Sequence, residues 1–144
     1  EETGHVSYDP ENHQKMVELR QQKVDVIAND IALAKAFGKG NGDLLVIGWG
    51  GTHGALRSAV ETAQEKGMSV SHLHLRHLNP LPRNLGEILV KFQKVMIAEL
   101  NMGQLAAIIR SKFLVDAVSL NKIQGKPFTI TEVFNKITEL VKGA

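Results

Sequence analysis

The chain has 144 residues, which is enough for one domain built around a single hydrophobic core. Hydrophobic residues make up 43% of it and charged residues 22%, a balance that is typical of globular proteins and excludes wholesale disorder. The net charge of +2 comes from 17 basic and 15 acidic residues spread along the chain, which leaves no basic stripe to follow a phosphate backbone. We therefore expect no nucleic-acid partner.

Two absences in the sequence narrow the function further. No stretch approaches the roughly 20 apolar residues that cross a bilayer, and the first residues do not form a signal peptide, so we expect a cytoplasmic protein without a membrane partner. The chain has no cysteine, which excludes a disulfide, a thiolate zinc site, a cysteine nucleophile and a cysteine-held iron–sulfur cluster. Any electron transfer must therefore occur on another chain. Because residue 1 is not methionine, we expect a processed or shortened form of a longer product.

The first 43 residues predict one helix and a connecting segment. Asp9 can cap the helix, Pro10 suits its first position and Glu11 is favourable at its positive end, so the helix should run from about Pro10 to Ala28. Apolar residues at helical spacing make one face, which needs a partner surface; they are Val17, Val24, Ile27 and Ile31, with Met16 and Leu19 adjoining. The sequence then loses this periodicity and gathers glycines. We therefore separate residues 1–43 from a domain over residues 44–144.

The remaining chain alternates between strand and helix patterns. The strand patterns lie at residues 43–49, 68–78, 94–100 and 115–123. The helix patterns lie at residues 52–67, 85–92, 101–114 and 129–144, the last with Thr129 or Thr131 as its cap. Such alternation predicts an α/β fold with a mostly parallel sheet that is covered by helices on both faces. Ligands and partners of these sheets gather beyond the carboxyl ends of the strands.

The glycine-rich turn "GWGGTHG", residues 48–54, follows the first strand at this edge. A phosphate bound there would meet backbone N–H groups at a helix N-terminus. The glycines do not have the G-x-G-x-x-G spacing, and no Lys-Ser or Lys-Thr pair ends the turn. The spacing thus favours a tight strand-to-helix turn, capped by Thr52, over a phosphate cradle. Trp49, in the same turn, could cover the sheet end or anchor a partner.

Histidines suggest a second kind of site. His72 and His74 are two apart in a predicted strand, so they share a face and could reach one metal ion together with His53, whereas His77 would point to the opposite face. No carboxylate lies close in sequence to complete a ligand set. We therefore favour histidines that pack beside the helices, and we predict no metal site.

No complete catalytic set is visible. The sequence has no G-x-S-x-G elbow, and a nucleophile would need a base that a third group orients. Glu99 and Asn101 end the third strand at the edge where an active site could lie, but one carboxylate and one amide define no reaction. The simpler interpretation is that they hydrogen-bond the next turn and cap the helix that starts near Gly103.

Long strings of the sequence carry a family resemblance. The most specific are "HLRHLNPLP", the block from Glu99 to Leu105, and "VDAVSLNKIQG". With "GDLLVIGWGGTHGALRSAVETAQEKG" and the opening "ETGHVSYDPENHQKMVELRQQKV", they resemble the C-terminal part of the alpha subunit of 2-oxoacid:ferredoxin oxidoreductases, of the 2-oxoglutarate type. The resemblance covers nearly the whole chain.

The resemblance implies a transketolase C-terminal-like fold, a three-layer α/β/α sandwich whose sheet is mixed, with one antiparallel edge strand. It also implies oxidative decarboxylation of a 2-oxoacid by a complete enzyme that uses thiamine diphosphate, Mg²⁺, iron–sulfur clusters, coenzyme A and ferredoxin. The cofactor diphosphate, the magnesium and the cluster cysteines are then expected on the beta subunit. The alpha subunit's N-terminal domain is missing from this sequence, so we expect the chain alone to be inactive and to serve in subunit and domain assembly.

The family resemblance marks site-edge or interface residues and no catalyst. His53, Asn101 and Gln104 match family positions, whereas Gly51 stands where the family often has a hydroxyl residue. The full set of binding or interface candidates is Trp49, Gly50, Gly51, Thr52, His53, Glu99, Asn101, Gly103 and Gln104. Two alternatives stay open, a stand-alone nucleotide- or small-anion-binding module and the C-terminal domain of a transketolase or branched-chain dehydrogenase.

Overall fold

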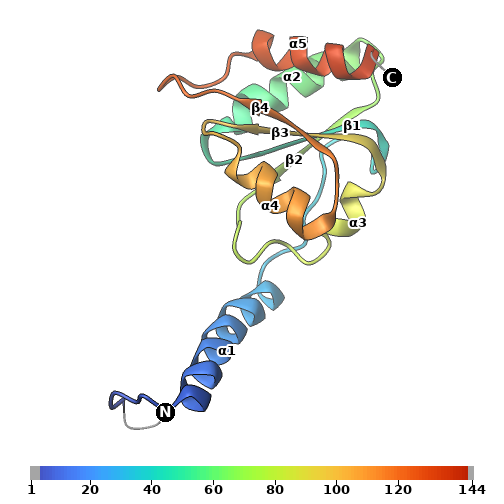
Figure 1. Cartoon of the computed structure of the whole chain (residues 1–144). Coiled ribbons are helices and arrows are strands. Elements are labelled where there is room, and N and C mark those ends of the chain that lie inside the picture. Colours follow the sequence, from blue (N-terminus) through green and yellow to red (C-terminus); the bar gives the residue numbers. More distant parts are fainter. Residues whose placement is uncertain (1–3, 143–144) are drawn as a thin grey trace.

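The computed structural model describes residues 4–142 and shows a four-stranded sheet between two layers of helices, with one helix that projects away from it (Figure 1). The strands are β1 (Gly42–Trp49), β2 (Val70–Leu75), β3 (Phe92–Glu99) and β4 (Ala117–Asn121). The helices are α1 (Pro10–Val26), α2 (His53–Glu65), α3 (Leu85–Leu89), α4 (Gln104–Phe113) and α5 (Ile130–Lys142), with single 3₁₀ turns η1 (Ile27–Asn29) and η2 (Gly50–Thr52). Every expected strand and helix is present. Residues 143–144, which we placed in the last helix, lie outside the described residues.

The sheet has the order β2-β1-β3-β4, and all neighbouring strands are parallel. Helices α3 and α4 pack on one face of it, and α2 and α5 pack on the other. This arrangement confirms the α/β/α sandwich. It also brings the carboxyl ends of β1 and β3 together at one edge of the sheet.

Strand β1 is buried on both faces, as its unbroken apolar sequence predicts. Leu45 and Ile47 belong to the core under α3 and α4, whereas Leu44 and Val46 belong to the core under α2 and α5. All four side chains are fully buried. Burial of one such side chain contributes about 1.5 to 3 kcal/mol, so this strand ties the two cores together.

The mixed sheet expected from the family resemblance is wrong for the described residues, because their four strands are all parallel. The antiparallel element is reduced to an isolated bridge at the free edge of β2, where Phe37 and His72 exchange backbone hydrogen bonds of 2.7 and 2.9 Å. Gly38 follows with a φ of +104°, in the left-handed region, and bends the chain out of strand geometry. A second pair therefore does not form.

The short helix α3 also ends earlier than its apolar pattern suggests. Its last residue is Leu89, and Val90 and Lys91 close it with backbone hydrogen bonds to Gly86 and Ile88. Phe92 therefore opens β3 and does not extend the helix. Its side chain still packs in the core next to Leu85 and Leu89, which is why the helical spacing looked continuous.

Helix α1 begins where its capping residues predict. The Asp9 carboxylate accepts a hydrogen bond of 3.1 Å from the backbone N–H of Glu11, and Pro10 is the first helical residue. No residue of α1 is buried, and Val17 and Leu19 are 46% and 45% exposed. The expected apolar face therefore does not pack on the sheet domain (Figure 1). None of the described helices is both long enough and apolar enough to span a bilayer.

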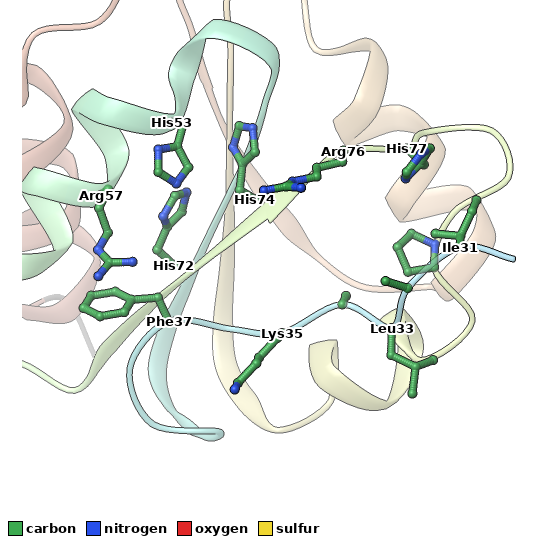
Figure 2. Close-up of a pocket in the computed structure, with 13 residues that line it drawn as sticks. Ile31, Leu33, Lys35, Phe37, His53, Arg57, His72, His74, Arg76 and His77 are labelled. Atoms are coloured by element: carbon green, nitrogen blue, oxygen red, sulfur yellow. The ribbon is translucent and has the colours of Figure 1, made fainter.

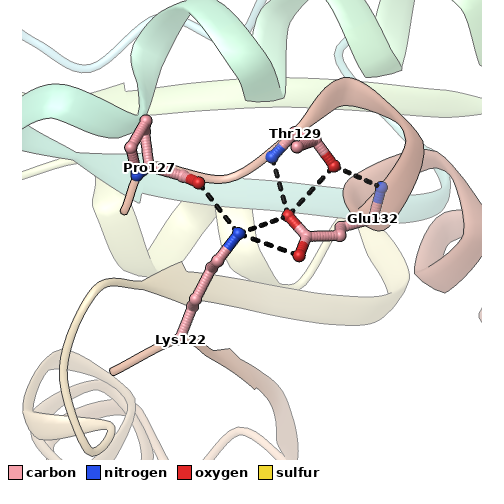
Figure 3. Close-up of polar contacts among 4 residues, drawn as sticks. All are labelled: Lys122, Pro127, Thr129 and Glu132. Carbon is pink, nitrogen blue, oxygen red and sulfur yellow. Dashed lines mark hydrogen bonds and ion pairs between the residues drawn. The ribbon is translucent and has the colours of Figure 1, made fainter. Parts of the chain in front are cut away.

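Helix α5 begins in a capping box (Figure 3). The Thr129 hydroxyl accepts a hydrogen bond from the Glu132 N–H at 3.2 Å, and the Glu132 carboxylate accepts one from the Thr129 N–H at 2.7 Å. The Lys122 ammonium donates to the same carboxylate at 2.8 Å and to the Pro127 carbonyl at 2.9 Å. The hydrogen bonds from Lys122 and then Thr129 lower the pKa of Glu132 to about 2. Thr129, one of the two expected caps, is thus the cap, and Lys122 holds the loop after β4 against α5.

Candidate functional site

The carboxyl edge of the sheet contains two turns that the sequence singled out. Strand β1 ends at Trp49 and leads through η2 into α2, and β3 ends at Glu99 and leads into α4. Because β1 and β3 are neighbours in the sheet, these turns lie side by side. The structure therefore brings Trp49, Glu99 and Asn101 together, as their positions at parallel strand ends predict.

The carboxylate of Glu99 is the centre of this edge. Its side chain is fully buried, and Oε1 accepts a hydrogen bond of 2.9 Å from the Ala106 N–H. Oε2 accepts hydrogen bonds from the Leu105 N–H at 2.9 Å, the Asn101 side-chain amide at 3.0 Å and the Trp49 indole at 3.4 Å. The negative charge lies at the positive end of α4, where it is stabilised by the helix dipole. Both oxygens are thus used to start α4.

Asn101 and Gly103 complete the turn between β3 and α4. The Asn101 Oδ1 accepts hydrogen bonds from the N–H groups of Gly103 at 2.7 Å and Gln104 at 3.4 Å. Gly103 has a φ of +99°, and a Cβ there would lie 3.2 Å from the side-chain amide of Asn121. The simpler interpretation of Glu99 and Asn101, that they bond the turn and cap the helix, is therefore confirmed.

The glycine turn after β1 is held by a hydrogen bond between two of its own residues, Thr52 and Trp49. We expected the Thr52 side chain to cap α2, and this is wrong, because the Thr52 hydroxyl donates to the Trp49 carbonyl at 2.9 Å. Thr52 has helical backbone angles, φ −83° and ψ −12°, since η2 continues directly into α2, whereas a capping side chain needs extended ones. A Cβ at Gly48 would overlap the Leu56 side chain. The first glycine thus allows α2 to approach the strand.

This edge does not fit a magnesium diphosphate. Magnesium needs oxygen ligands that are not already engaged, and its usual protein ligands are carboxylates. The carboxylate of Glu99 accepts four hydrogen bonds within the protein. Within residues 4–142, no group of three histidine, aspartate or glutamate side chains is arranged to hold a metal ion. The side chains of Glu99, Asn101 and Thr52 thus have partners within the protein, and the edge offers no carboxylate to magnesium.

The histidines gather at a different place, in a pocket at the free edge of β2 (Figure 2). His72 and His74 lie on the same face of β2, as their spacing predicts, with ring centroids 6.0 Å apart. The ring of His53, from the start of α2, lies 5.5 Å from His72 and 4.9 Å from His74. His77 was expected on the opposite face, and this is wrong: β2 ends at Leu75, so the loop brings His77 back to the same pocket.

The pocket has a volume of about 410 Å³ and is closed on its outer side by residues 31–37. The side chain of Asn84 holds this segment, since its Oδ1 accepts from the Ala34 N–H at 2.8 Å and its Nδ2 donates to the Ala34 carbonyl at 2.9 Å. Sequence reasoning missed this wall because Asn84 and Ala34 are 50 residues apart. We call this cavity the histidine pocket.

Three cationic side chains line the histidine pocket, and sequence reasoning missed all of them: Lys35, Arg57 and Arg76. The spacing of His53 and Arg57, four residues apart on α2, was a usable signal that both face one side. The Arg57 guanidinium lies 3.0 Å from the centroid of the Phe37 ring and donates to Glu61 at 2.7 Å. Among the residues that the structure describes, no acidic side chain lines the pocket.

Burial in the pocket favours the neutral form of two of its histidines, His72 and His74. Burial, together with the nearby charges of His53, His74 and Arg57, lowers the pKa of His72 to about 4. Burial, together with His53 and Arg76, also lowers the pKa of His74. His72 is buried, His74 is half-buried and His53 is exposed, which agrees with the packed interpretation of these histidines. His72 and His74 therefore add no positive charge at neutral pH to that of Lys35, Arg57 and Arg76.

Comparison with known proteins adds a family and several relatives. Residues 42–133 match the family described as pyruvate:ferredoxin oxidoreductase core domain II. The chain is 43% identical over 142 residues to the 2-oxoglutarate oxidoreductase subunit KorA of Mycobacterium tuberculosis, covering 98% of this chain and 21% of that protein. It is 30% identical over 151 residues to the alpha subunit of 2-oxoacid:ferredoxin oxidoreductase 1 of Aeropyrum pernix, covering 99% of this chain and 24% of that protein.

Comparison with solved structures also finds a 2-oxoglutarate:ferredoxin oxidoreductase. The chain superposes with a TM-score of 0.90 and 28% identity on a 2-oxoglutarate:ferredoxin oxidoreductase from Magnetococcus marinus that has 2-oxoglutarate, coenzyme A and succinyl-CoA bound, over 98% of this chain and 25% of that one. A split-gene transketolase matches with a TM-score of 0.59 and 14% identity over 75% of this chain and 41% of that one, which shows a shared fold. The chain thus spans 21% and 24% of the length of the two curated relatives above.

Proposed function

The chain belongs to the pyruvate:ferredoxin oxidoreductase core domain II family, and from this premise we propose that it acts as the C-terminal domain of the alpha subunit of a 2-oxoglutarate:ferredoxin oxidoreductase. The observation that carries the proposal is the 43% identity to a 2-oxoglutarate oxidoreductase subunit over 98% of this chain. The likeness includes the projecting helix α1, which lies outside residues 42–133. In this proposal we keep the division expected from the sequence, an N-terminal helix and connecting segment in residues 1–43 and an α/β domain in residues 44–144.

The proposed role is assembly and not catalysis by this chain alone. The one carboxylate at the carboxyl edge is occupied in starting α4, and the Thr52 hydroxyl is occupied by the Trp49 carbonyl. An activated nucleophile or base would need a side chain that is available to a substrate. The Glu99–Trp49 edge instead gives a rigid surface against which another domain can pack.

The surface that we assign to this packing combines exposed and supporting residues. Met102 is 79% exposed and lies in the same turn as Gln104, and His53 is exposed beside Gly50 and Gly51. Thr52 and Glu99 are buried, so they support the edge and do not touch a partner. Trp49, Asn101 and Gly103 are half-buried between these two groups. The projecting α1, with its exposed Val17 and Leu19, provides a second surface for the rest of the alpha subunit.

The complete enzyme, in this proposal, carries out oxidative decarboxylation of 2-oxoglutarate in the cytoplasm. Thiamine diphosphate, Mg²⁺ and coenzyme A would serve the reaction, and iron–sulfur clusters would pass electrons to ferredoxin. The absence of cysteine from this chain requires that the clusters be held elsewhere, and we assign them and the diphosphate to the beta subunit. The bound 2-oxoglutarate, coenzyme A and succinyl-CoA of the Magnetococcus marinus enzyme support this set of substrates.

The proposal is tested by reconstitution. The chain carrying an affinity tag is co-expressed with the remaining domains of the alpha subunit and with the beta subunit. We expect the three to co-purify and to reduce methyl viologen when both 2-oxoglutarate and coenzyme A are present. The chain alone is expected to be inactive. Turnover by the chain alone, or a failure to co-purify with either part, would contradict the proposal.

A matched pair of variants tests the packing surface. Met102→Glu places a charge at the centre of the proposed interface and should lower the co-purified yield, because burying an unpaired charge is unfavourable. Ile123→Glu makes the same change at a position that is 65% exposed and lies in the loop after β4, and it should have no effect. Equal losses for both variants would show that Met102 has no special role.

The two alternative functions are separated by different observations. The family match favours the ferredoxin-linked enzymes over a transketolase or branched-chain dehydrogenase domain, since the transketolase likeness at 14% identity shows the fold alone. A stand-alone nucleotide-binding module would bind adenine nucleotides tightly without any partner subunit. Calorimetry with adenine nucleotides, on the chain and the beta subunit each alone and together, distinguishes such a module from the proposed subunit domain.

A further inference from the structure

The histidine pocket shares only His53 with the proposed packing surface and poses a separate question. It lies on the α2 side of β2, between that strand and the segment of residues 31–37 (Figure 2). Its volume of about 410 Å³ falls within the range of about 300 to 1,000 Å³ that is typical of small-molecule sites. It therefore has room for a small organic molecule.

Two buried nitrogen atoms in the pocket wall lack partners. His72 Nε2 and His74 Nδ1 make no hydrogen bond within the described residues, although both atoms are shielded from solvent. The His72 side chain is only 2% exposed. An unpaired buried polar group costs about 1 to 3 kcal/mol, so most such groups in proteins have a partner. The exposed ring of His53 packs against both rings, at centroid distances of 5.5 and 4.9 Å.

The charge of the pocket selects for an anion. Lys35 and Arg76 make no hydrogen bond or ion pair within the part of the chain that the structure describes, and only Arg57 has an acidic partner, Glu61. Helix α2 starts at His53 without a side-chain cap, so its positive end also lies at this end of the pocket. Lone cations in a concave site raise the local concentration of anions. A divalent metal ion would be repelled by the same charges.

The lining of the pocket also suits a ligand that has an apolar part. Figure 2 shows His53, His72 and His74 together at one end, whereas Ile31 and His77 lie at the other end, with Arg76 extending between them. Leu33 and Pro82 also line the cavity. A ligand with an anionic group at the histidine end and a less polar body toward Ile31 would satisfy both halves.

We propose that the histidine pocket binds the phosphoryl or carboxylate group of a small organic molecule, with Arg76 neutralising its charge and His72 and His74 donating hydrogen bonds to its oxygens. Neutral imidazole can present an N–H at either ring nitrogen, so the bound oxygens select the tautomer. The inference rests on the pocket geometry and is independent of the proposed enzyme. A failure of one therefore leaves the other standing.

The test is an NMR titration of the chain alone at constant ionic strength, which follows the imidazole C–H signals. The probes are inorganic phosphate, adenosine monophosphate and succinate, each added to millimolar concentration. We expect saturating shifts of the His53, His72 and His74 signals, while His5 and His13, which lie outside the pocket, report non-specific effects. Response to phosphate and the nucleotide indicates a phosphoryl ligand, and response to succinate indicates a carboxylate. The absence of saturating shifts with all three overturns the proposal.

Variants that remove one charge distinguish specific binding in the pocket from non-specific electrostatic attraction to the protein. Arg76→Gln should weaken binding about tenfold, which corresponds to the loss of one charge contact of about 1.4 kcal/mol. Arg20→Gln removes the same charge from exposed α1 and should leave the affinity within about twofold. Equal weakening by Arg20→Gln overturns the proposal. Saturating shifts with Zn²⁺ alone, retained in Arg76→Gln, would assign the histidines to a metal and overturn it as well.

Discussion

The indole N–H of Trp49 donates a hydrogen bond of 3.4 Å to the buried carboxylate of Glu99, which links the ends of β1 and β3. The same carboxylate accepts hydrogen bonds from backbone N–H groups in the first turn of α4. The turn after β1 is therefore fastened to the helix after β3 through one charged group. A change at Glu99 should affect both turns.

Replacement of Glu99 by glutamine tests this fastening. Glu99→Gln keeps the shape but turns one oxygen into an NH₂ group that faces backbone N–H donors, so hydrogen bonds to a charged acceptor are lost. We expect the free energy of unfolding to fall by about 2 to 3 kcal/mol in urea denaturation. Glu65→Gln, at an exposed position on α2, is the matched control and should change it by less than about 0.5 kcal/mol. An equal effect of the two variants would refute the role of Glu99.

The glycine turn gives a second pair of variants. A Cβ at Gly48 would overlap the Leu56 side chain and lie 2.5 Å from the Thr52 hydroxyl, whereas a Cβ at Gly51 would meet no atom within 4 Å. Gly48→Ala should therefore lower the free energy of unfolding by about 1 to 3 kcal/mol. Gly51→Ala should be near neutral. Thermal unfolding of both variants checks this, and a neutral Gly48→Ala would show that α2 can move away from the strand at little cost.

The sequence predicted the order of elements because each one carries its own pattern. The unbroken apolar run from Leu44 to Ile47 is typical of a strand between two helix layers, and the structure buries it completely. The cap at Asp9 and the capping box at Thr129 were predictable for the same reason, since their partners lie within three residues. Local chemistry thus determines where these elements start.

The parts that the sequence did not predict depend on contacts between distant segments. The pocket wall at Ala34 is held by Asn84, and neither residue belongs to a periodic pattern. The Thr52 hydroxyl was assigned as a cap from its position, but the 3₁₀ turn before it sets helical backbone angles and directs the hydroxyl to the Trp49 carbonyl. Residue type alone does not report these angles. The histidines could be paired from their spacing in β2, but the surrounding cations could not.

The buried His72 should make stability depend on pH. Its pKa is lowered from 6.5 to about 4 in the folded chain, so between these values the unfolded chain binds more protons. The free energy of unfolding therefore rises with pH across this window and is lower at pH 4.5 than at pH 7. A shift of this size corresponds to a loss on the order of 3 kcal/mol when the pH falls below the window.

Urea denaturation at pH 7 and pH 4.5 measures this dependence. His72→Gln removes the titrating group and should flatten the profile, whereas His13→Gln, on exposed α1, should leave it unchanged. The pKa of Glu132 is lowered from 4.5 to about 2. Its contribution to the free energy of unfolding is therefore complete above pH 4.5 and is lost only as the pH falls toward 2. An unchanged slope for His72→Gln would contradict the assignment to His72.

The end of α4 offers a stabilising change. Leu114 has a φ of +54°, in the left-handed region, and its side chain is 89% exposed. A side chain in this conformation is strained, and glycine is the usual residue at this position after a helix. Leu114→Gly should raise the free energy of unfolding by about 0.5 to 1 kcal/mol, after its larger loss of chain entropy. Leu114→Ala keeps the Cβ and should stay near neutral, so an equal gain from alanine would rule out relief of backbone strain.

Residues 31–37 connect α1 to the sheet domain and also form the outer wall of the histidine pocket. Helix α1 and the wall are one continuous stretch of chain, fastened to the domain by the Asn84 amide at Ala34 and by Arg83, which donates to Asn29 at 2.9 Å. Any movement of α1 that breaks these bonds would also displace the pocket wall. If a ligand of the pocket contacts this wall, the position of α1 and the affinity for that ligand would change each other by equal amounts of free energy.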